Sequence, residues 1–307
     1  MSKSNSLEAI VIGAGPGGLT AALYLARYRR KTLVIHDDTA RASRIPLTHN
    51  VPGFPDGIAG PDLLARMTEH ASHYGAEFER ATVTAIKPLS DGFEVALEGG
   101  AIRRSRIVIL ATGLLLNQVD LPHEVHEQAI KDDVLRYCAV CDAYEHIDRA
   151  IAVAGCEDSG ASQAMFLARY SNDVTLFPQD PDGLADEDRT KLGKMGVKIV
   201  ERPMESVTPT SESMMLKARG SSEEWEFGVL YPCYGTRPRT ELAKAMGLPL
   251  EESGNLHSGS HFKTDIPGFF AAGDIVDGLD QISVAMGHGA IAATKAHSWL
   301  REQDGHV

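Results

Sequence analysis

A glycine-rich turn between a strand and a helix, close to the N-terminus, constrains the fold of this chain more than any other feature. The apolar run Leu7–Ile12 leads into Gly13-Ala-Gly-Pro-Gly-Gly18, and a helical pattern follows from Gly17 to Tyr28. The apolar run Thr32–Ile35 comes next. Strand, glycine turn, helix and strand in this order predict a βαβ unit, whose strands lie parallel in an α/β sheet.

The same order of elements returns in the middle of the chain. A strand is predicted over Ala150–Ala154, a turn over Gly155–Gly160, a helix over Ala161–Tyr170 and a strand over Asp173–Phe177. A chain of 307 residues is long enough for two domains. We therefore predict an α/β protein with two Rossmann-like three-layer domains, the second covering about 118–240.

The first glycine turn has the spacing of a dinucleotide-binding site. A GxGxxG turn lets the backbone approach a pyrophosphate, and the helix that follows offers free N–H groups. The residues expected to hold the pyrophosphate are Gly13, Gly15, Pro16, Gly17 and Gly18. The acid that usually binds the ribose should end the next strand, where the chain has His36, Asp37 and Asp38. These three side chains either bind the ribose or only solvate the strand end.

Two further motifs favour FAD over NAD at the first turn. The predicted strand Gly268–Ala272 runs into Gly273 and Asp274, where flavoproteins place an aspartate on the ribityl chain. A predicted helix from Gln281 to Glu302 would direct its N-terminal amides at the flavin. Ala111, Thr112 and Gly113 end another strand and are typical of the point where a chain leaves a flavin domain.

A pair of cysteines, Cys138 and Cys141, has the CxxC spacing of a redox motif and is followed by Asp142. This spacing brings two sulfurs close enough to form and break a disulfide, and the aspartate can move the proton that the exchange requires. A zinc site or an inert buried pair is the alternative. Zinc normally takes four ligands, and the remaining Cys156 and Cys233 lack the spacing to complete it. We expect both of these to be structural.

The net charge limits the classes of partner. The chain carries a formal charge of -12 and has a pI near 5.4, so it repels nucleic acid and anionic membrane surfaces. The N-terminal segment Met1–Ser6 is polar and lacks the apolar core of a signal peptide. We therefore expect a cytoplasmic protein, where a CxxC pair is more often catalytic than structural.

These motifs, in this order, resemble the low-molecular-weight thioredoxin reductase family, a class of FAD-dependent pyridine nucleotide-disulfide oxidoreductases. The resemblance covers nearly the whole chain, and it rests on Gly13–Gly18, Asn50-Val-Pro-Gly-Phe-Pro55, Ala111–Gly113, Cys138–Asp142, and Gly273-Asp274 with Gln281. It implies a homodimer whose FAD domain is built from both chain ends, 1–117 and 241–307. The redox-cysteine domain, 118–240, is inserted between them.

The resemblance also implies roles for individual residues. Cys141 is the sulfur nearest the flavin, Cys138 meets the substrate disulfide, and Asp142 is the acid–base residue. The residues implied or expected to contact FAD outside the glycine turn and strand ends are Arg41, Arg44, His49, Asn50, Asp274, Gln281 and Ile282. No metal is expected.

The inserted domain departs from the family where NADPH should bind. Its turn reads Gly155-Cys-Glu157-Asp-Ser-Gly160, so Glu157 stands where the second glycine belongs. The next strand ends in Leu176-Phe-Pro-Gln-Asp-Pro-Asp182, without the basic cluster that grips the NADP 2′-phosphate. A carboxylate in place of a glycine blocks and repels a pyrophosphate. We therefore expect a family branch with a degenerate NADPH site.

Several functions remain open at this point. The first is an FAD-dependent disulfide oxidoreductase that exchanges electrons between FAD, the Cys138–Cys141 pair and a disulfide of a thioredoxin-like protein or a small molecule. Ferredoxin or another electron carrier would replace NADPH as the donor. The alternatives are a conventional NADPH-dependent thioredoxin reductase, a dithiol oxidase that uses oxygen, and a non-enzymatic flavin redox sensor.

Overall fold

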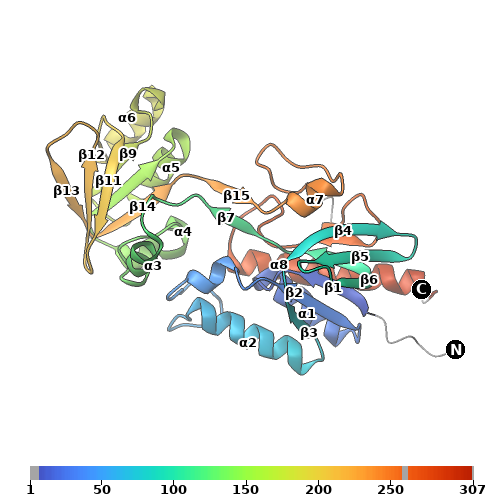
Figure 1. The fold of residues 1–307 in the computed structure, drawn as a ribbon. Helices are drawn as coiled ribbons and strands as arrows, with labels where there is room; N and C mark the ends of the chain where they lie inside the picture. The colour runs from blue at the N-terminus through green and yellow to red at the C-terminus, as the bar shows by residue number, and fades with distance from the viewer. Residues whose placement is uncertain (1–6, 258–261, 306–307) are drawn as a thin grey trace.

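The chain forms two lobes joined by two linker strands (Figure 1). The computed structural model describes residues 7–257 and 262–305. The segment Met1–Ser6, on which the expectation of no signal peptide rests, lies outside the described residues.

The first lobe contains a seven-stranded sheet in the order β3-β2-β1-β6-β5-β4, with β16 paired to β6. One part of the sheet is parallel and consists of β1, β2, β3, β6 and β16. The remaining two pairs, β5 with β6 and β4 with β5, are antiparallel. The strands are β1 (Leu7–Ile12), β2 (Thr32–His36), β3 (Glu77–Arg80), β4 (Val83–Leu89), β5 (Gly92–Leu97), β6 (Ile102–Leu110) and β16 (Phe269–Ala271).

Helices pack on this sheet around an apolar core. The helices of this lobe are α1 (Pro16–Arg27), α2 (Gly60–His73), α7 (Glu241–Ala245) and α8 (Ile282–Gln303), with a 3-10 turn η1 (Arg41–Arg44). Helices α1 and α8 approach so closely that a Cβ at Gly289 would lie 2.1 Å from the Gly17 oxygen. Since β16 and α8 come from the C-terminal part of the chain, both ends of the sequence build this lobe (Figure 1).

The second lobe contains a parallel four-stranded sheet in the order β10-β9-β8-β14 and an antiparallel sheet β11-β12-β13. The strands are β8 (Ile151–Gly155), β9 (Val174–Pro178), β10 (Lys198–Ile199), β11 (Met204–Pro209), β12 (Met214–Ala218), β13 (Glu224–Phe227) and β14 (Val229–Cys233). The helices and 3-10 turns are α3 (His123–Lys131), α4 (Ala139–Asp142), η2 (Ala143–His146), α5 (Glu157–Leu167), η3 (Pro181–Gly183) and α6 (Asp186–Lys194).

The chain passes between the lobes through β7 (Leu114–Leu116) and β15 (Thr236–Pro238). These strands pair antiparallel, with Leu116 opposite Thr236 and Leu114 opposite Pro238. The entry and exit of the second lobe therefore lie side by side. The domain boundaries 117/118 and 240/241 stay a prediction.

One helix begins earlier than the sequence predicts. The expected start of α5 was Ala161, and the observed start is Glu157. Gly160 N–H already bonds to the Cys156 carbonyl at 2.5 Å, so residues expected in the turn form the first helical turn. Acidic and small polar residues are favourable there because the helix dipole is positive at its N-terminus.

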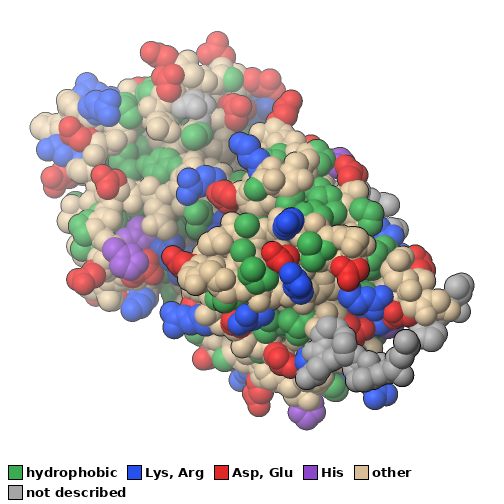
Figure 2. Space-filling model, turned by 45° about the vertical axis from the view of Figure 1, so that its right-hand side comes forward, with side chains coloured by type: hydrophobic (Ala, Val, Ile, Leu, Met, Phe, Trp, Pro, Cys, Tyr) green, Lys and Arg blue, Asp and Glu red, His purple; other side chains and the backbone are tan. Residues whose placement is uncertain are grey.

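Acidic side chains lie on both lobes in the face shown in Figure 2, with Lys and Arg among them. Within the described residues, none of the helices has the length and apolar character of a bilayer-spanning segment.

Candidate active site

The first glycine turn, between β1 and α1, has two glycines that the fold itself requires. Gly13 has a φ of 108°, and a Cβ there would lie 2.3 Å from the Ala111 oxygen. A Cβ at Gly18 would lie 2.0 Å from the Gly13 oxygen. Gly15 differs, because a Cβ at this position would have no atom within 4 Å. Gly15 therefore faces open space, where a bound group can approach the backbone.

That open space is a cavity of about 840 Å³ in the first lobe. Most residues predicted from the sequence to bind the cofactor line it. They are Gly13, Gly15, Pro16, Gly17, His36, Asp37, Arg41, Ala111, Thr112, Gly113, Gly273, Asp274, Gln281 and Ile282. Gly18 lies behind the turn, in contact with Gly13.

These residues fit an FAD. The Gly15 backbone and the first turn of α1 would hold the pyrophosphate, since unpaired N–H groups and the helix dipole attract anions. Asp274 also lines the cavity, where Arg41 contacts it at 3.1 Å and donates to the Asp280 carbonyl at 3.0 Å. Burial raises the pKa of Asp274 above its ordinary value, and Arg41 acts against that rise.

The strand end at His36 carries a network that the sequence did not indicate. His36 Nδ1 lies 2.9 Å from Asp38. Asp37 accepts from Arg239 at 2.7 Å and from the Thr39 hydroxyl at 2.6 Å. Burial opposes ionisation of Asp37, but the bonds from Thr39 and Arg239 outweigh it and lower its pKa. Asp37 is thus a fixed carboxylate at the cavity wall.

Cys138 and Cys141 form a disulfide at the start of α4. The side-chain amide of Gln281 contacts the disulfide and Asn50. Its Nε2 lies 3.4 Å from each sulfur, and its Oε1 accepts a hydrogen bond from Asn50 Nδ2 at 3.0 Å. A second cavity of about 130 Å³ reaches both cysteines, and it shares Arg41, Ile45, Gln281 and Ile282 with the first. The two cavities therefore adjoin, one at the glycine turn and the other at the disulfide.

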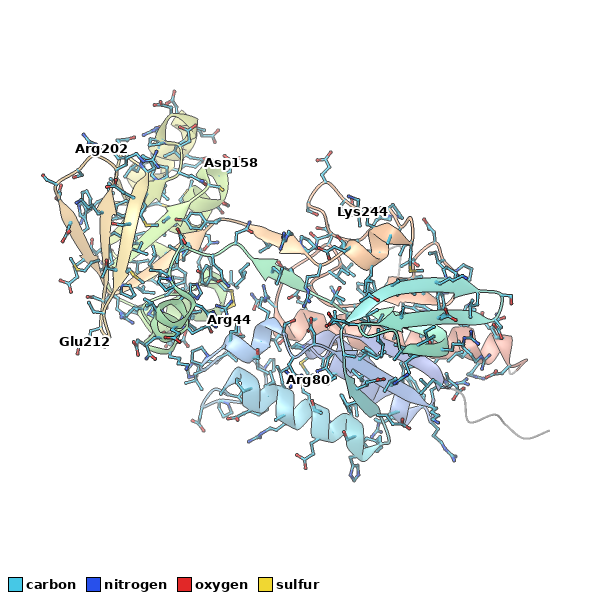
Figure 3. The ribbon with its side chains drawn as sticks, viewed as in Figure 1. Arg44, Arg80, Asp158, Arg202, Glu212 and Lys244 are labelled. Carbon is cyan, nitrogen blue, oxygen red and sulfur yellow. A yellow bond between two sulfur atoms is a disulfide. The ribbon has the colours of Figure 1, made fainter. Side chains whose placement is uncertain are left out.

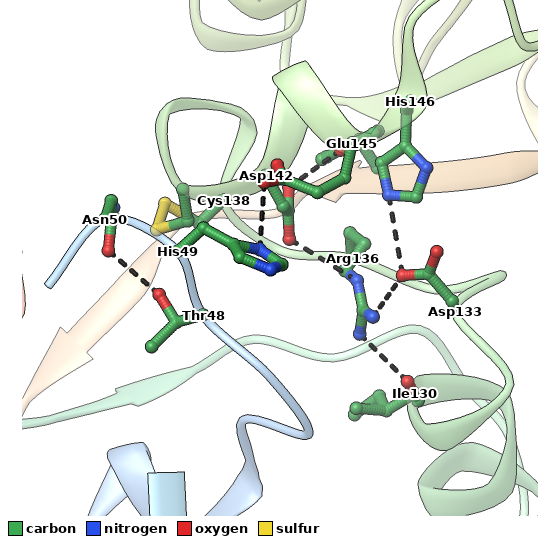
Figure 4. A network of polar contacts seen from close by, with 12 residues as sticks. Thr48, His49, Asn50, Ile130, Asp133, Arg136, Cys138, Asp142, Glu145 and His146 are labelled. Carbon is green, nitrogen blue, oxygen red and sulfur yellow. Dashed lines mark hydrogen bonds and ion pairs between the residues drawn. A yellow bond between two sulfur atoms is a disulfide. The ribbon is translucent and has the colours of Figure 1, made fainter. Parts of the chain in front are cut away.

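Asp142 lies directly after the disulfide, in a half-buried polar network (Figure 4). The Tyr231 hydroxyl donates to Asp142 Oδ1 at 2.7 Å, and Arg136 Nε lies 3.4 Å from Oδ2. Burial raises the pKa of Asp142 to about 7, although Tyr231 and Arg136 act in the opposite direction. Asp142 can therefore exchange a proton near neutral pH.

Two predicted cofactor contacts lie elsewhere. Arg44, labelled in Figure 3, reaches from η1 to the second lobe, where it pairs with Glu127 at 2.5 Å and contacts His126 at 3.1 Å. His49 Nδ1 lies 3.0 Å from Glu145. The structure brings neither side chain to the larger cavity, because carboxylates of the facing lobe hold both. Asn50 and Arg44 line the smaller cavity instead.

Three residues of the site escaped the sequence analysis. Arg239 and Asp280 line the cavities, and Tyr231 bonds to Asp142. Burial next to Asp274 raises the pKa of Asp280 to about 6. The position of Asp280 directly before Gln281 could have indicated that it lines the site. We find no such sequence pattern at Arg239 or Tyr231.

The second glycine turn, between β8 and α5, has glycine only at Gly155 and Gly160. At both positions a Cβ would meet a neighbouring part of the fold. Gly155 has a φ of 149°, and a Cβ there would lie 2.5 Å from the Cys233 oxygen. A Cβ at Gly160 would meet Leu176 at 3.3 Å. Glu157 begins α5, and Asp158 is exposed on the same helical turn (Figure 3). Two acids thus occupy the helix N-terminus.

The end of β9 is also unlike a phosphate site. The Asp180 side chain accepts from the Asp182 backbone and caps η3. Arg189 reaches this segment, but it donates to the carbonyls of Pro181 and Leu184 and pairs with Glu201 at 2.6 Å.

The two remaining cysteines lie at this turn and in the neighbouring strand. Cys156 Sγ lies 3.7 Å from Gln179, and Cys233 is buried.

Comparison with known proteins agrees with this arrangement. The family model described as pyridine nucleotide-disulphide oxidoreductase matches residues 7–289. A thioredoxin reductase of Mycolicibacterium smegmatis is 31% identical over 99% of this chain and 100% of its own length.

Solved structures agree over the same length. The crystal structure of HlmI superposes with a TM-score of 0.90 at 28% identity, over 99% of this chain and 96% of that one. The thioredoxin reductase of Streptococcus pyogenes gives 0.88 at 27% identity, over 97% and 100%. The chain therefore belongs to the pyridine nucleotide-disulphide oxidoreductase family and is a flavin-dependent disulfide oxidoreductase of the thioredoxin reductase type.

Proposed function

We propose that this enzyme passes electron pairs between FAD and a substrate disulfide through Cys138 and Cys141, and that NADPH is not its effective donor. The observation that supports the first part most strongly is the position of the disulfide. Both sulfurs lie 3.4 Å from Gln281, which lines the cavity that begins at the glycine turn.

Each cysteine has its own role in this proposal. The Cys138–Cys141 disulfide would accept an electron pair from reduced FAD held in the larger cavity, which leaves the flavin oxidised, and with two protons it gives two thiols. The Cys138 thiolate then attacks the substrate disulfide, releases one thiol and leaves a mixed disulfide. Cys141 attacks the Cys138 sulfur, releases the second thiol and restores the Cys138–Cys141 disulfide. Asp142, the next residue in the chain, holds or returns the proton.

The second glycine turn supports the exclusion of NADPH. Any side chain at its middle position keeps a pyrophosphate from the backbone, and Glu157 and Asp158 add negative charge. The end of β9 offers Gln179 and Asp180, and the nearby Arg189 is already paired with Glu201. A 2′-phosphate at this point would meet carboxylates rather than a guanidinium.

The remaining parts of the proposal concern partners. A ferredoxin or another electron carrier would supply electrons to the flavin. The oxidised partner would be a thioredoxin-like protein or a small disulfide. We further propose a homodimer, as the family resemblance implies, and a cytoplasmic location, as the polar N-terminal segment suggests.

An anaerobic titration with dithiothreitol tests the role of the cysteine pair. We expect the dithiol to bleach the flavin absorbance of the parent enzyme, and Cys138→Ser and Cys141→Ser to lose this reaction at least about 100-fold. Cys156→Ser is the matched control, since this cysteine lies in the second turn. Equal bleaching in all four proteins would show that electrons reach the flavin without the pair.

A further inference from the structure

A tyrosine and an arginine hold the Asp142 carboxyl from two sides. The Tyr231 hydroxyl, from β14, donates to Oδ1 at 2.7 Å, and the Arg136 guanidinium, from the segment before Cys138, lies 3.4 Å from Oδ2. Tyr231 is fully buried, and 12% of the Arg136 side chain is exposed. One carboxyl oxygen therefore has a hydrogen-bond donor, and the other faces a cation.

We propose that Tyr231 and Arg136 are positioning residues for proton transfer, which fix the direction of the Asp142 carboxyl and set the pH range in which it serves the cysteine pair. This inference rests on the role of Asp142 in the proposed function. It adds two residues outside the lining of the larger cavity, of which Arg136 lines the smaller one.

Tyr231 acts as a permanent donor. Burial raises the pKa of its hydroxyl far above the ordinary value, and the nearby carboxylate raises it further. The hydroxyl thus keeps its proton at every working pH. A donor that never ionises stabilises the carboxylate form of Asp142 and leaves the protonated form without that advantage.

The Arg136 guanidinium is fixed by more contacts than its ion pair with Asp142. Its guanidinium also donates to the Ile130 carbonyl at 2.8 Å and to Asp133 (Figure 4). Asp133 in turn pairs with Arg149 at 3.2 Å and lies 3.6 Å from the His146 ring. Since Arg136 shares its charge with Asp133, it only partly neutralises Asp142.

The other charged groups around Asp142 act against its ionisation. Asp133 and Glu145 both raise its pKa, and Glu145 is itself paired with His49. Burial lowers the pKa of His146 to about 4, so this ring is neutral at pH 7. Burial and two acids therefore favour the neutral carboxyl, whereas Tyr231 and Arg136 favour the carboxylate.

This balance suits a group that gives and regains one proton in each cycle. When the Cys138 thiolate attacks a substrate disulfide, the departing alkyl thiolate needs a proton. Neutral Asp142 supplies it, and Tyr231 and Arg136 stabilise the carboxylate that remains. The exchange rate should therefore fall as the pH rises through the pKa of Asp142.

The test follows the pre-reduced enzyme, anaerobically mixed with bis(2-hydroxyethyl) disulfide, through the reoxidation of its flavin absorbance between pH 5.5 and 9. Removing the Tyr231 hydroxyl takes a donor from the carboxylate, which raises the pKa of Asp142. We expect Tyr231→Phe to move the alkaline decline of the rate upward by about one pH unit. Arg136→Gln should move it in the same direction, and it replaces Tyr231→Phe if that variant fails to fold.

Two controls separate positioning from a structural role. Tyr234→Phe removes the hydroxyl of another tyrosine, which is half-buried and follows Cys233, and should leave the decline where it is in the parent. An aromatic disulfide, whose leaving thiolate is stable without a proton, should show no alkaline decline in any variant.

The outcomes distinguish the inference from the proposed function. If Asp142→Asn keeps the parent profile, Asp142 is not the proton carrier and that part of the proposed function fails. If Asp142→Asn removes the decline but Tyr231→Phe and Arg136→Gln leave it unmoved, the positioning inference alone is overturned.

Discussion

The two glycine turns of this chain share a fold and differ in what they can bind. In both, the first glycine has a positive φ and abuts a carbonyl of the neighbouring strand end, Ala111 for Gly13 and Cys233 for Gly155. In both, the last glycine lets the helix pack on the turn. The middle position is Gly15, open to the cavity, in one turn and Glu157 in the other.

The difference separates what folding needs from what binding needs. Backbone packing requires Gly13, Gly18 and Gly155, because a Cβ at each would overlap a carbonyl oxygen, whereas a Cβ at Gly160 would meet only the Leu176 side chain at 3.3 Å. The middle glycine is required only by a pyrophosphate that approaches the backbone. A βαβ unit can therefore keep its shape after it has lost its nucleotide, and a GxGxxG-like pattern has to be read position by position.

The largest effect should come from placing a glutamate, the middle residue of the second turn, at the middle position of the first turn. We expect Gly15→Glu to weaken FAD binding about 1,000-fold, since a like-charge contact near a protein surface costs on the order of 4 kcal/mol. Flavin fluorescence of the filtrate after dialysis measures the loss. Gly15→Ala, whose Cβ meets no protein atom within 4 Å, adds a methyl group without charge and should weaken binding less than Gly15→Glu does. Full flavin retention in Gly15→Glu would refute the comparison.

The first glycine should be equally important for stability in both turns. We expect Gly13→Ala and Gly155→Ala each to reduce the free energy of unfolding by about 3 kcal/mol, because a methyl group would overlap a carbonyl oxygen. Urea denaturation followed by circular dichroism measures this. Gly193→Ala, on an exposed helical position with open space, should be neutral or slightly stabilising. A Gly155→Ala protein as stable as the parent would show that the second turn accommodates a methyl group at its first glycine, which would contradict this expectation.

Restoring the second turn should recover part of its binding. We expect Glu157→Gly combined with Gln179→Arg and Asp180→Arg to accelerate flavin bleaching by NADPH roughly 10- to 100-fold, since two phosphate contacts return. The single variant Glu157→Gly should gain less than the triple variant. If the triple variant gains nothing, features other than these residues exclude the nucleotide.

The smallest effect concerns the strand end of the first unit. Asp37→Asn removes the bond to Arg239 and should cost about 0.5–1 kcal/mol at pH 7. Because the folded-state pKa of Asp37 is lowered, its contribution is present above its unfolded pKa and disappears as the pH falls through the folded value. The stabilities of parent and variant should therefore converge below about pH 4. A constant difference down to pH 2 would contradict this origin.

Local patterns predict much of the fold. The strand Leu7–Ile12 lies where its apolar run predicts it, and the predicted helix over Gln281–Glu302 is observed as Ile282–Gln303. These elements are continuous in sequence, so their periodicity contains the signal. The start of α5 was misplaced because the glycine spacing suggested a longer turn than the backbone adopts.

Residues that act across the fold escaped prediction. Arg239 is 202 positions from Asp37, and Tyr231 is 89 from Asp142. Neither position has a local pattern that points to its partner. The place of Arg44 and His49 in the loop predicts contacts with FAD, whereas the facing carboxylates Glu127 and Glu145 decide where the two side chains point.

The most direct test of the central claim is rapid anaerobic mixing of the enzyme with NADPH, followed at the flavin absorbance band. We expect dithiothreitol to bleach the flavin through Cys138 and Cys141, and an equal concentration of NADPH to react at least about 100-fold more slowly. Bleaching by NADPH as fast as by the dithiol would show that the second turn serves a nicotinamide nucleotide, which would contradict the account.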